Sequence, residues 1–327
     1  MGLLSPTRKP TIPAAISRLP ALCAAALLLF PPAATSAEPG VGDDDTRLRV
    51  VTTLPVLAGL IAEIGGDRID VVSLLRAGDD VHVFEPLPVD MKALRGADVI
   101  YQIGLDLEPW LDPMIRSSGT GATRIRLSDG IDRIPAGGHH GHAGHRHAYG
   151  SDDPHIWMDP VRVTFMAISI AETLAEADPG GAGTYLDRAE AVVADINRTH
   201  RRVSALLDDI PEEHRKLVTP HDNYRYFAER YGFAIAGTIA GRASTDHFDP
   251  SARHIKALVD AIRAAGLPAV FSVDGENNPM LERIAERSGC TVAGPLYCTT
   301  LKPGASYAET LLHNATVLRD ALRPRPL

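Results

Sequence analysis

The 327-residue chain has few cysteines, few basic residues and no long hydrophobic run. Three cysteines are too few for a disulfide-built scaffold. No stretch reaches the roughly 18–20 apolar residues of a membrane-spanning helix, which excludes a polytopic membrane protein. Asp and Glu (41) outnumber Lys and Arg (33), and nucleic-acid affinity depends largely on basic side chains, so no nucleic-acid partner is expected. The remaining composition is that of a soluble chain long enough for two lobes with separate cores.

The N-terminus has the features of a secretory signal peptide. Residues 1–37 contain three basic residues and no acidic one, and an apolar run at 19–30 is followed by small residues up to Ala37. This order is typical of a cleaved signal, and the run is too short for an anchor. Cys23 lies inside the run, which disfavours a lipid-anchored cysteine. The prediction is a periplasmic or otherwise extracytoplasmic mature chain with a net charge of −11.

The mature chain keeps two cysteines, Cys290 and Cys298. In an exported protein, two cysteines eight positions apart predict a disulfide bond. The alternative is that Cys298 supplies a thiolate ligand to a metal.

Apolar β-branched runs alternate with helical periodicity, which predicts an α/β fold of two (β/α) lobes joined by a long rigid helix. We expect an N-terminal lobe at 38–178, a connecting helix at 179–210 and a C-terminal lobe at 211–327. The expected strands are 47–53, 69–75, 98–103, 124–127, 216–219, 234–239, 269–273 and 291–296. The expected helices are 55–64, 89–94, 107–115, 161–177, 184–207, 224–231, 251–265, 279–287 and 306–322.

A histidine-rich segment at 137–150 interrupts the globular pattern. It has almost nothing to bury, so it predicts a mobile loop. A solvated spacer is the simpler interpretation, but imidazole is a good ligand for Zn²⁺, which favours an auxiliary metal-collecting loop. Its five histidines are His139, His140, His142, His145 and His147.

Three other histidines lie in loops that lead into helices: His82, His155 and His221. Two of them follow expected strands, where open α/β sheets place ligands. Each alone is compatible with a core or capping role. Carboxylates nearby, Glu85 and Asp159, match the outer shell that orients metal-binding imidazoles. Together the three histidines predict a metal site.

Three motifs make the chain recognisable: D-V-H-V-F-E-P at 80–86, D-P-H-I-W-M-D-P at 153–160 and H-D-N-Y-R-Y-F-A-E-R-Y-G at 221–232. They resemble the metal-binding solute receptors of zinc and manganese ABC importers, the zinc-uptake receptor group. The resemblance covers essentially the whole mature chain.

The resemblance implies two lobes with the metal bound in the cleft between them, His82 and His155 from the first lobe and His221 from the second. It also implies a monomer that delivers metal to an ABC permease, with a periplasmic zinc chaperone as a further candidate partner. Manganese receptors of this group usually carry Glu at the position of His221. A third imidazole favours Zn²⁺ over Mn²⁺.

One loop departs from the family pattern. Family members usually supply an Asp ligand from a loop of the form L-Y-x-D-x-L, where this chain has Thr299. The fourth position is left to water, Asp274, Glu276 or Cys298. The missing carboxylate predicts weaker zinc binding or faster release than in a four-ligand member.

Two other function classes remain open from the sequence. A three-histidine zinc site with an open position also suits a secreted metallohydrolase, with Glu85, Asp274 or Glu276 as base. However, neither H-E-x-x-H nor G-x-S-x-G occurs. A zinc-buffering or adhesin surface protein needs only the histidine loop. The favoured prediction is a zinc receptor without enzymatic activity.

Overall fold

The computed structural model describes residues 47–81, 84–135, 152–239, 251–274 and 278–323. They belong to one compact unit, Asp44–Leu327. Several predicted features lie outside the described residues. These are the signal peptide at 1–37, His82, Glu276 and the five histidines of the 137–150 segment.

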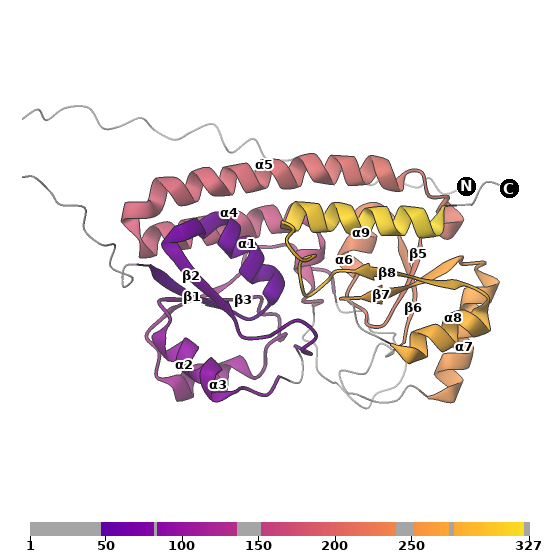
Figure 1. Cartoon of the computed structure of the whole chain (residues 1–327), viewed down its shortest axis with the longest axis horizontal. Helices are drawn as coiled ribbons and strands as arrows, with labels where there is room; N and C mark the ends of the chain where they lie inside the picture. Colours follow the sequence, from indigo (N-terminus) through magenta and orange to yellow (C-terminus); the bar gives the residue numbers. More distant parts are fainter. Residues whose placement is uncertain (1–46, 82–83, 136–151, 240–250, 275–277, 324–327) are drawn as a thin grey trace, which may run out of the picture. The chain divides into compact units, whose positions relative to one another are not determined.

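The first half of this unit is built on a four-stranded parallel sheet in the order β2-β1-β3-β4 (Figure 1). Val50 and Val51 of β1 are both buried, but in different clusters: Val50 in the main core, Val51 with residues of α2 and α3. A parallel strand with helices on both faces must be apolar at successive positions. The elements are β1 (Leu48–Thr52), α1 (Pro55–Gly65), β2 (Ile69–Ser73), α2 (Pro88–Gly96), β3 (Val99–Gln102), α3 (Leu111–Ser118) and β4 (Thr123–Arg126).

The second half repeats this pattern with two parallel strand pairs, β5-β6 and β7-β8, and β5 lies next to β7. Leu217 and Val218 of β5 again point into different clusters. The elements are β5 (Lys216–Thr219), α6 (Arg225–Tyr231), β6 (Ala234–Thr238), α7 (Ala252–Ala264), β7 (Ala269–Val273), α8 (Pro279–Ser288), β8 (Thr291–Leu296) and α9 (Tyr307–Leu322).

Helices α4 (Pro160–Ala177) and α5 (Ala182–Leu207) lie between the two sets in sequence. At 1.5 Å per residue, the 26 residues of α5 span about 39 Å. Helix α5 packs against α4 and α1 of the first half and against α9 of the second (Figure 1). The structure confirms the predicted α/β fold. Short 3-10 turns complete the chain: η1 (Gly66–Arg68), η2 (Ile156–Met158), η3 (Pro179–Gly181) and η4 (Glu212–His214).

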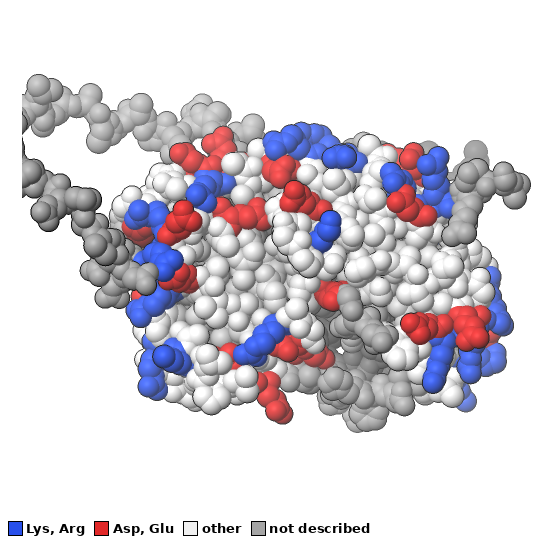
Figure 2. All heavy atoms as spheres, viewed as in Figure 1, with Lys and Arg blue, Asp and Glu red and all other residues white. Residues whose placement is uncertain are grey.

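The described surface is mixed in charge. On the face drawn in Figure 2, acidic and basic side chains lie intermixed around a largely uncharged centre, so the acidic excess is not gathered into one patch there. None of the helices within the described ranges is both long and apolar enough to cross a membrane.

Candidate metal centre

His155 lies in a buried turn just before η2. The residue is 6% exposed, and its ring lies 5.2 Å from the ring of Trp157. Its Nδ1 is 2.8 Å from Oδ1 of Asp153, which also accepts a 2.9 Å hydrogen bond from the His155 backbone N–H. A carboxylate only accepts, so Nδ1 carries the proton and, in the neutral ring, Nε2 carries the lone pair. Such a carboxylate–imidazole pair is the usual outer support of a metal-binding histidine.

Asp153 is therefore the carboxylate that orients His155, and the prediction that Asp159 does so is wrong. Burial acts to raise the pKa of Asp153, but the hydrogen bonds and charge of His155, together with the charge of Arg225 3.6 Å away, lower it overall. The sequence alone does not distinguish the two carboxylates, because both lie close to the histidine, Asp153 two positions before it and Asp159 four positions after it. The prediction selected Asp159, on the C-terminal side of His155, on the basis of proximity in sequence.

Asp159 instead binds arginines. Its side chain is fully buried, and Arg230 of α6 donates two hydrogen bonds to it, at 2.8 and 2.6 Å. Arg162 donates to the same carboxylate, and the backbone N–H of Val161 donates to it at 3.0 Å. Asp159 thus caps α4 and joins it to α6.

His221 follows β5 directly and is exposed. Its backbone carbonyl accepts a 2.7 Å hydrogen bond from the Thr219 hydroxyl, which shapes the turn beyond the strand. The chain then becomes buried at Asn223 and Tyr224, and α6 begins at Arg225. The position of His221 at the carboxyl end of a parallel strand is the one the sequence predicts.

The segment that carries His82 is fastened on both sides of the undescribed stretch 82–83. The indole N–H of Trp110 donates to the carbonyl of Val81 at 2.7 Å. The ring of Phe84 lies 4.6 Å from the ring of Trp110. Trp110 is a supporting residue that the sequence analysis missed, since nothing in the local pattern links it to position 82.

The loop after β8 is organised by Asp274, at the end of β7. The two carboxylate oxygens of Asp274 accept five hydrogen bonds of 2.7–3.3 Å from the backbone N–H groups of Cys298, Thr299 and Thr300 and the hydroxyls of Thr299 and Thr300. Asp274 itself has a left-handed backbone, with φ at 52°. Thr299, at the position where the family pattern has Asp, therefore uses its hydroxyl to bind Asp274.

The predicted disulfide between Cys290 and Cys298 is wrong. The two sulfurs are not bonded to each other. The residues between them form the extended strand β8, and at about 3.3 Å per residue this places the two cysteines well beyond the 7 Å that a disulfide allows between Cα atoms.

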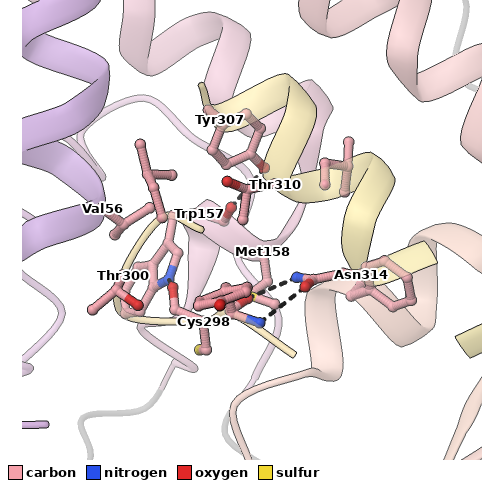
Figure 3. Close-up of a pocket in the computed structure, with 12 residues that line it drawn as sticks. Val56, Trp157, Met158, Cys298, Thr300, Tyr307, Thr310 and Asn314 are labelled. Carbon is pink, nitrogen blue, oxygen red and sulfur yellow. Dashed lines mark hydrogen bonds between the residues drawn. The ribbon is translucent and has the colours of Figure 1, made fainter. Parts of the chain in front are cut away.

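Cys298 is 1% exposed and belongs to the main core. It lines a cavity of about 20 Å³ together with Trp157 and Tyr307 (Figure 3). The indole N–H of Trp157 donates to the Cys298 carbonyl at 2.9 Å, and the Tyr307 hydroxyl donates to the Trp157 carbonyl at 2.8 Å. The loop after β8 is thereby attached to the segment that carries His155.

The described residues on the two sides of the histidine-rich segment pair with each other close to His155. Pro135 and Asp152 form an isolated antiparallel bridge, and the N–H of Asp153 donates to the carbonyl of Ile134 at 2.8 Å. The described chain stops at Pro135 and resumes at Asp152, three positions before His155.

The elements that follow two of the three predicted ligands are in contact with each other. Turn η2, which follows His155, is in contact with α6, which begins just after His221. Within the described ranges, no group of three or more His, Cys, Asp or Glu side chains is arranged to hold a metal ion. The third predicted imidazole, His82, lies outside those ranges.

Comparison with known proteins identifies the family of the chain. Residues 50–321 match the family described as zinc-uptake complex component A, periplasmic. The chain is 30% identical over 275 residues to the manganese-binding lipoprotein MntA of Halalkalibacterium halodurans, covering 84% of this chain and 87% of that protein. It is 26% identical over 286 residues to the iron ABC transporter substrate-binding lipoprotein MtsA of Streptococcus pyogenes serotype M1, covering 84% and 89%.

A crystal structure of ZnuA superposes with a TM-score of 0.70 at 27% identity, covering 84% of this chain and all but 1% of that one. The family description names zinc uptake, and the relatives are named for manganese and iron. These proteins therefore share a role in metal ABC transport and differ in the metal for which they are named. Receptors of this kind bind solute outside the cytoplasm and work with a permease. The chain belongs to the zinc-uptake component A family and is an extracytoplasmic substrate-binding protein of a metal ABC transporter.

Proposed function

We propose that this receptor binds Zn²⁺ through the imidazoles of His82, His155 and His221 and delivers it to its ABC permease. The observation that carries the proposal is the hydrogen bond between Nδ1 of His155 and Asp153. It selects the tautomer with the lone pair on Nε2 and increases the basicity of that nitrogen. A buried imidazole prepared in this way suits a borderline divalent metal.

The choice of zinc over manganese rests on the residue types. Three imidazoles favour Zn²⁺, whereas Mn²⁺ prefers oxygen ligands. His221→Glu would restore the residue usual in manganese receptors of this group, and we expect it to lower the ratio of zinc to manganese affinity.

Water is the best candidate for the fourth ligand. Asp274 accepts five hydrogen bonds from its own loop, which a role as ligand would disturb. Cys298 is buried in the main core. Thr299→Asp would offer a carboxylate at the family position, and we expect about tenfold tighter zinc binding, at some cost in stability because it lies beside Asp274. Unchanged zinc affinity in Thr299→Asp would contradict an open fourth position.

The five histidines of the 137–150 segment are proposed as weaker collecting sites, tethered beside His155 by the Pro135–Asp152 bridge. Deleting residues 138–148 should lower the zinc stoichiometry and leave the tightest site. A monomeric receptor and a periplasmic zinc chaperone remain part of this proposal.

The decisive experiment is a competitive Zn²⁺ titration of the mature protein against a chelator of known affinity. His155→Ala should abolish the tight site. The matched control is His214→Ala, because the His214 ring bonds to the Leu322 carbonyl and not to any predicted ligand segment. We expect the control to bind like the wild type.

Two outcomes would count against the proposal. If His155→Ala binds as tightly as His214→Ala, zinc binding resides in the histidine-rich segment. If the wild type binds Mn²⁺ at least as tightly as Zn²⁺, the cargo is misassigned while the receptor role stands.

A further inference from the structure

A buried group of charges joins the segment that carries His155 to helix α6. We call Asp159, Arg162 and Arg230 the Asp159 cluster. Arg230 meets both carboxylate oxygens of Asp159, at 2.8 and 2.6 Å, and the carboxylate has no exposed surface. A two-pronged guanidinium–carboxylate pair fixes orientation as well as distance. The start of α4 and the end of α6 are therefore held in one geometry.

Tyr226 makes a second connection from the same helix. Its hydroxyl donates to the Asp153 carbonyl at 2.7 Å and accepts from the Ile134 N–H at 3.1 Å. The guanidinium of Arg162 lies 4.5 Å over its ring. Tyr226 and Arg230 are four positions apart, so they share one face of α6. That face is attached to the 153–162 segment at two points.

The charges around this contact balance. Asp153 lies 3.6 Å from Arg225, and Glu229 lies 3.8 Å from Arg162. With the Asp159–Arg230 pair this makes three carboxylates and three guanidinium groups. Removing one partner of a buried pair leaves its neighbour uncompensated. The contact therefore depends most on the buried carboxylates Asp153 and Asp159, since the Glu229 side chain is 58% exposed and an exposed pair contributes little.

Two of the predicted ligands, His155 and His221, lie close in sequence to the elements that carry the Asp159 cluster. Turn η2 separates Asp159 from His155, and the Met158 N–H donates to the His155 carbonyl at 3.1 Å. His221 lies four positions before the first residue of α6. Arg230 contacts neither imidazole, but it holds the two supports of these imidazoles against each other.

We propose that Arg230 is a positioning residue for metal binding: through Asp159 and α6, it sets the placement of His155 relative to His221. This inference rests on the proposed metal centre. It assigns to the Asp159 cluster a role in the affinity and release rate of the metal, in addition to its contribution to folding.

The test is Arg230→Lys in the mature protein. Lysine keeps the charge but is a single point donor and cannot hold both oxygens in one plane. We expect zinc affinity to fall about tenfold, as for loss of an outer support of a metal site. The zinc release rate should rise accordingly. With Co²⁺ as the probe, the visible absorption bands should change in shape, which reports ligand geometry directly.

The matched control is Arg68→Lys. Arg68 also donates twice, at 2.7 Å, to a single aspartate, Asp178, which accepts from the hydroxyl of Tyr185 as well. This pair contacts no predicted ligand segment. Arg68→Lys should lower the melting temperature of the metal-free protein while leaving zinc affinity, zinc release and the Co²⁺ bands unchanged.

A milder variant, Tyr226→Phe, covers the case in which Arg230→Lys does not fold. It removes only the hydroxyl that donates to the Asp153 carbonyl. Like Arg230→Lys, it should raise the zinc release rate. The inference is overturned if the folded variants bind and release metal as Arg68→Lys does while His155→Ala loses the tight site. If His155→Ala keeps that site, the proposed metal centre itself is wrong, and this inference falls with it.

Discussion

Asp153 and Asp274 are both carboxylates at the margin of the proposed metal centre, yet they hold different things. Asp153 accepts from the imidazole of His155 and so aims a predicted ligand. Among the described residues, Asp274 accepts from the loop after β8, through five donors, and so fixes the conformation of that loop. The role of each carboxylate follows from the groups that donate to its oxygens. An imidazole donates to Asp153, whereas the backbone and hydroxyl groups of a loop donate to Asp274. Proximity to a metal site does not distinguish the two roles.

The largest effect is expected from Asp274→Asn. An amide replaces one acceptor with a donor facing N–H groups, which leaves several donors unsatisfied. We expect the free energy of unfolding to fall by about 3 kcal/mol in urea titrations, with zinc affinity changed less than about threefold. Asp260→Asn is the control, because its pair with Lys256 is exposed on α7 and contributes little. A large loss of zinc affinity with little loss of stability would make Asp274 a ligand.

The converse substitution is Asp153→Asn. A neutral amide still accepts from Nδ1 but supports the imidazole less, so zinc affinity should fall 10- to 100-fold, or about 1.4–2.7 kcal/mol. Asp152→Asn is the neighbouring control, since Asp152 pairs with Arg133 at 3.5 Å on the other side of the chain. Equal zinc affinities in the two variants would remove Asp153 from the site.

The contribution of Asp153 to the stability of the fold should depend on pH. The pKa of Asp153 is lowered in the folded protein despite its burial, because His155 and Arg225 favour the carboxylate. A lowered pKa stabilises the fold above the unfolded value of about 3.9, and that contribution is lost as the pH falls through the folded pKa. The stability difference between metal-free wild type and Asp153→Asn should therefore narrow from pH ~5 to pH ~3 in urea titrations. A difference that widens with acid would contradict the assigned shift.

The smallest effect is expected at the cysteines. Since Cys290 and Cys298 are not bonded to each other, a reducing agent should leave the melting temperature of the mature protein unchanged. A native disulfide typically contributes 2–5 kcal/mol, so its reduction would be obvious. A clear drop in melting temperature would show that the two sulfurs pair.

Hydrophobic periodicity predicted the order of the elements well. Strands β5, β7 and β8 have the predicted bounds, because each is a short apolar run between helical segments. One helix begins four residues later than predicted, at Leu111. The cause is Glu108, whose buried carboxylate accepts from the N–H groups of Ile103 and Gly104 and from the hydroxyl of Thr53. The two backbone contacts hold residues 103–108 as a turn, and the bond from Thr53, 55 positions away, fixes the carboxylate there, which no local pattern shows.

The site was predicted less completely. Imidazoles followed by helices were visible as a motif, and the structure places His155 and His221 accordingly. The roles of the carboxylates were not visible, because they depend on which donors the fold brings near Asp153, Asp159 and Asp274. The predicted disulfide was wrong for a different reason: the strand correctly predicted at 291–296 already places the two cysteines too far apart, and the spacing argument left that strand out.

The chain has only two tryptophans, and both contact segments of the proposed metal centre. Trp110 is hydrogen-bonded beside position 82, and Trp157 lies against the ring of His155. With excitation that selects tryptophan over the eight tyrosines, the emission therefore comes from two chromophores placed beside predicted ligand segments. Emission becomes a built-in reporter of metal arrival and departure, and Trp110→Phe would separate the signal of one ligand segment from that of the other.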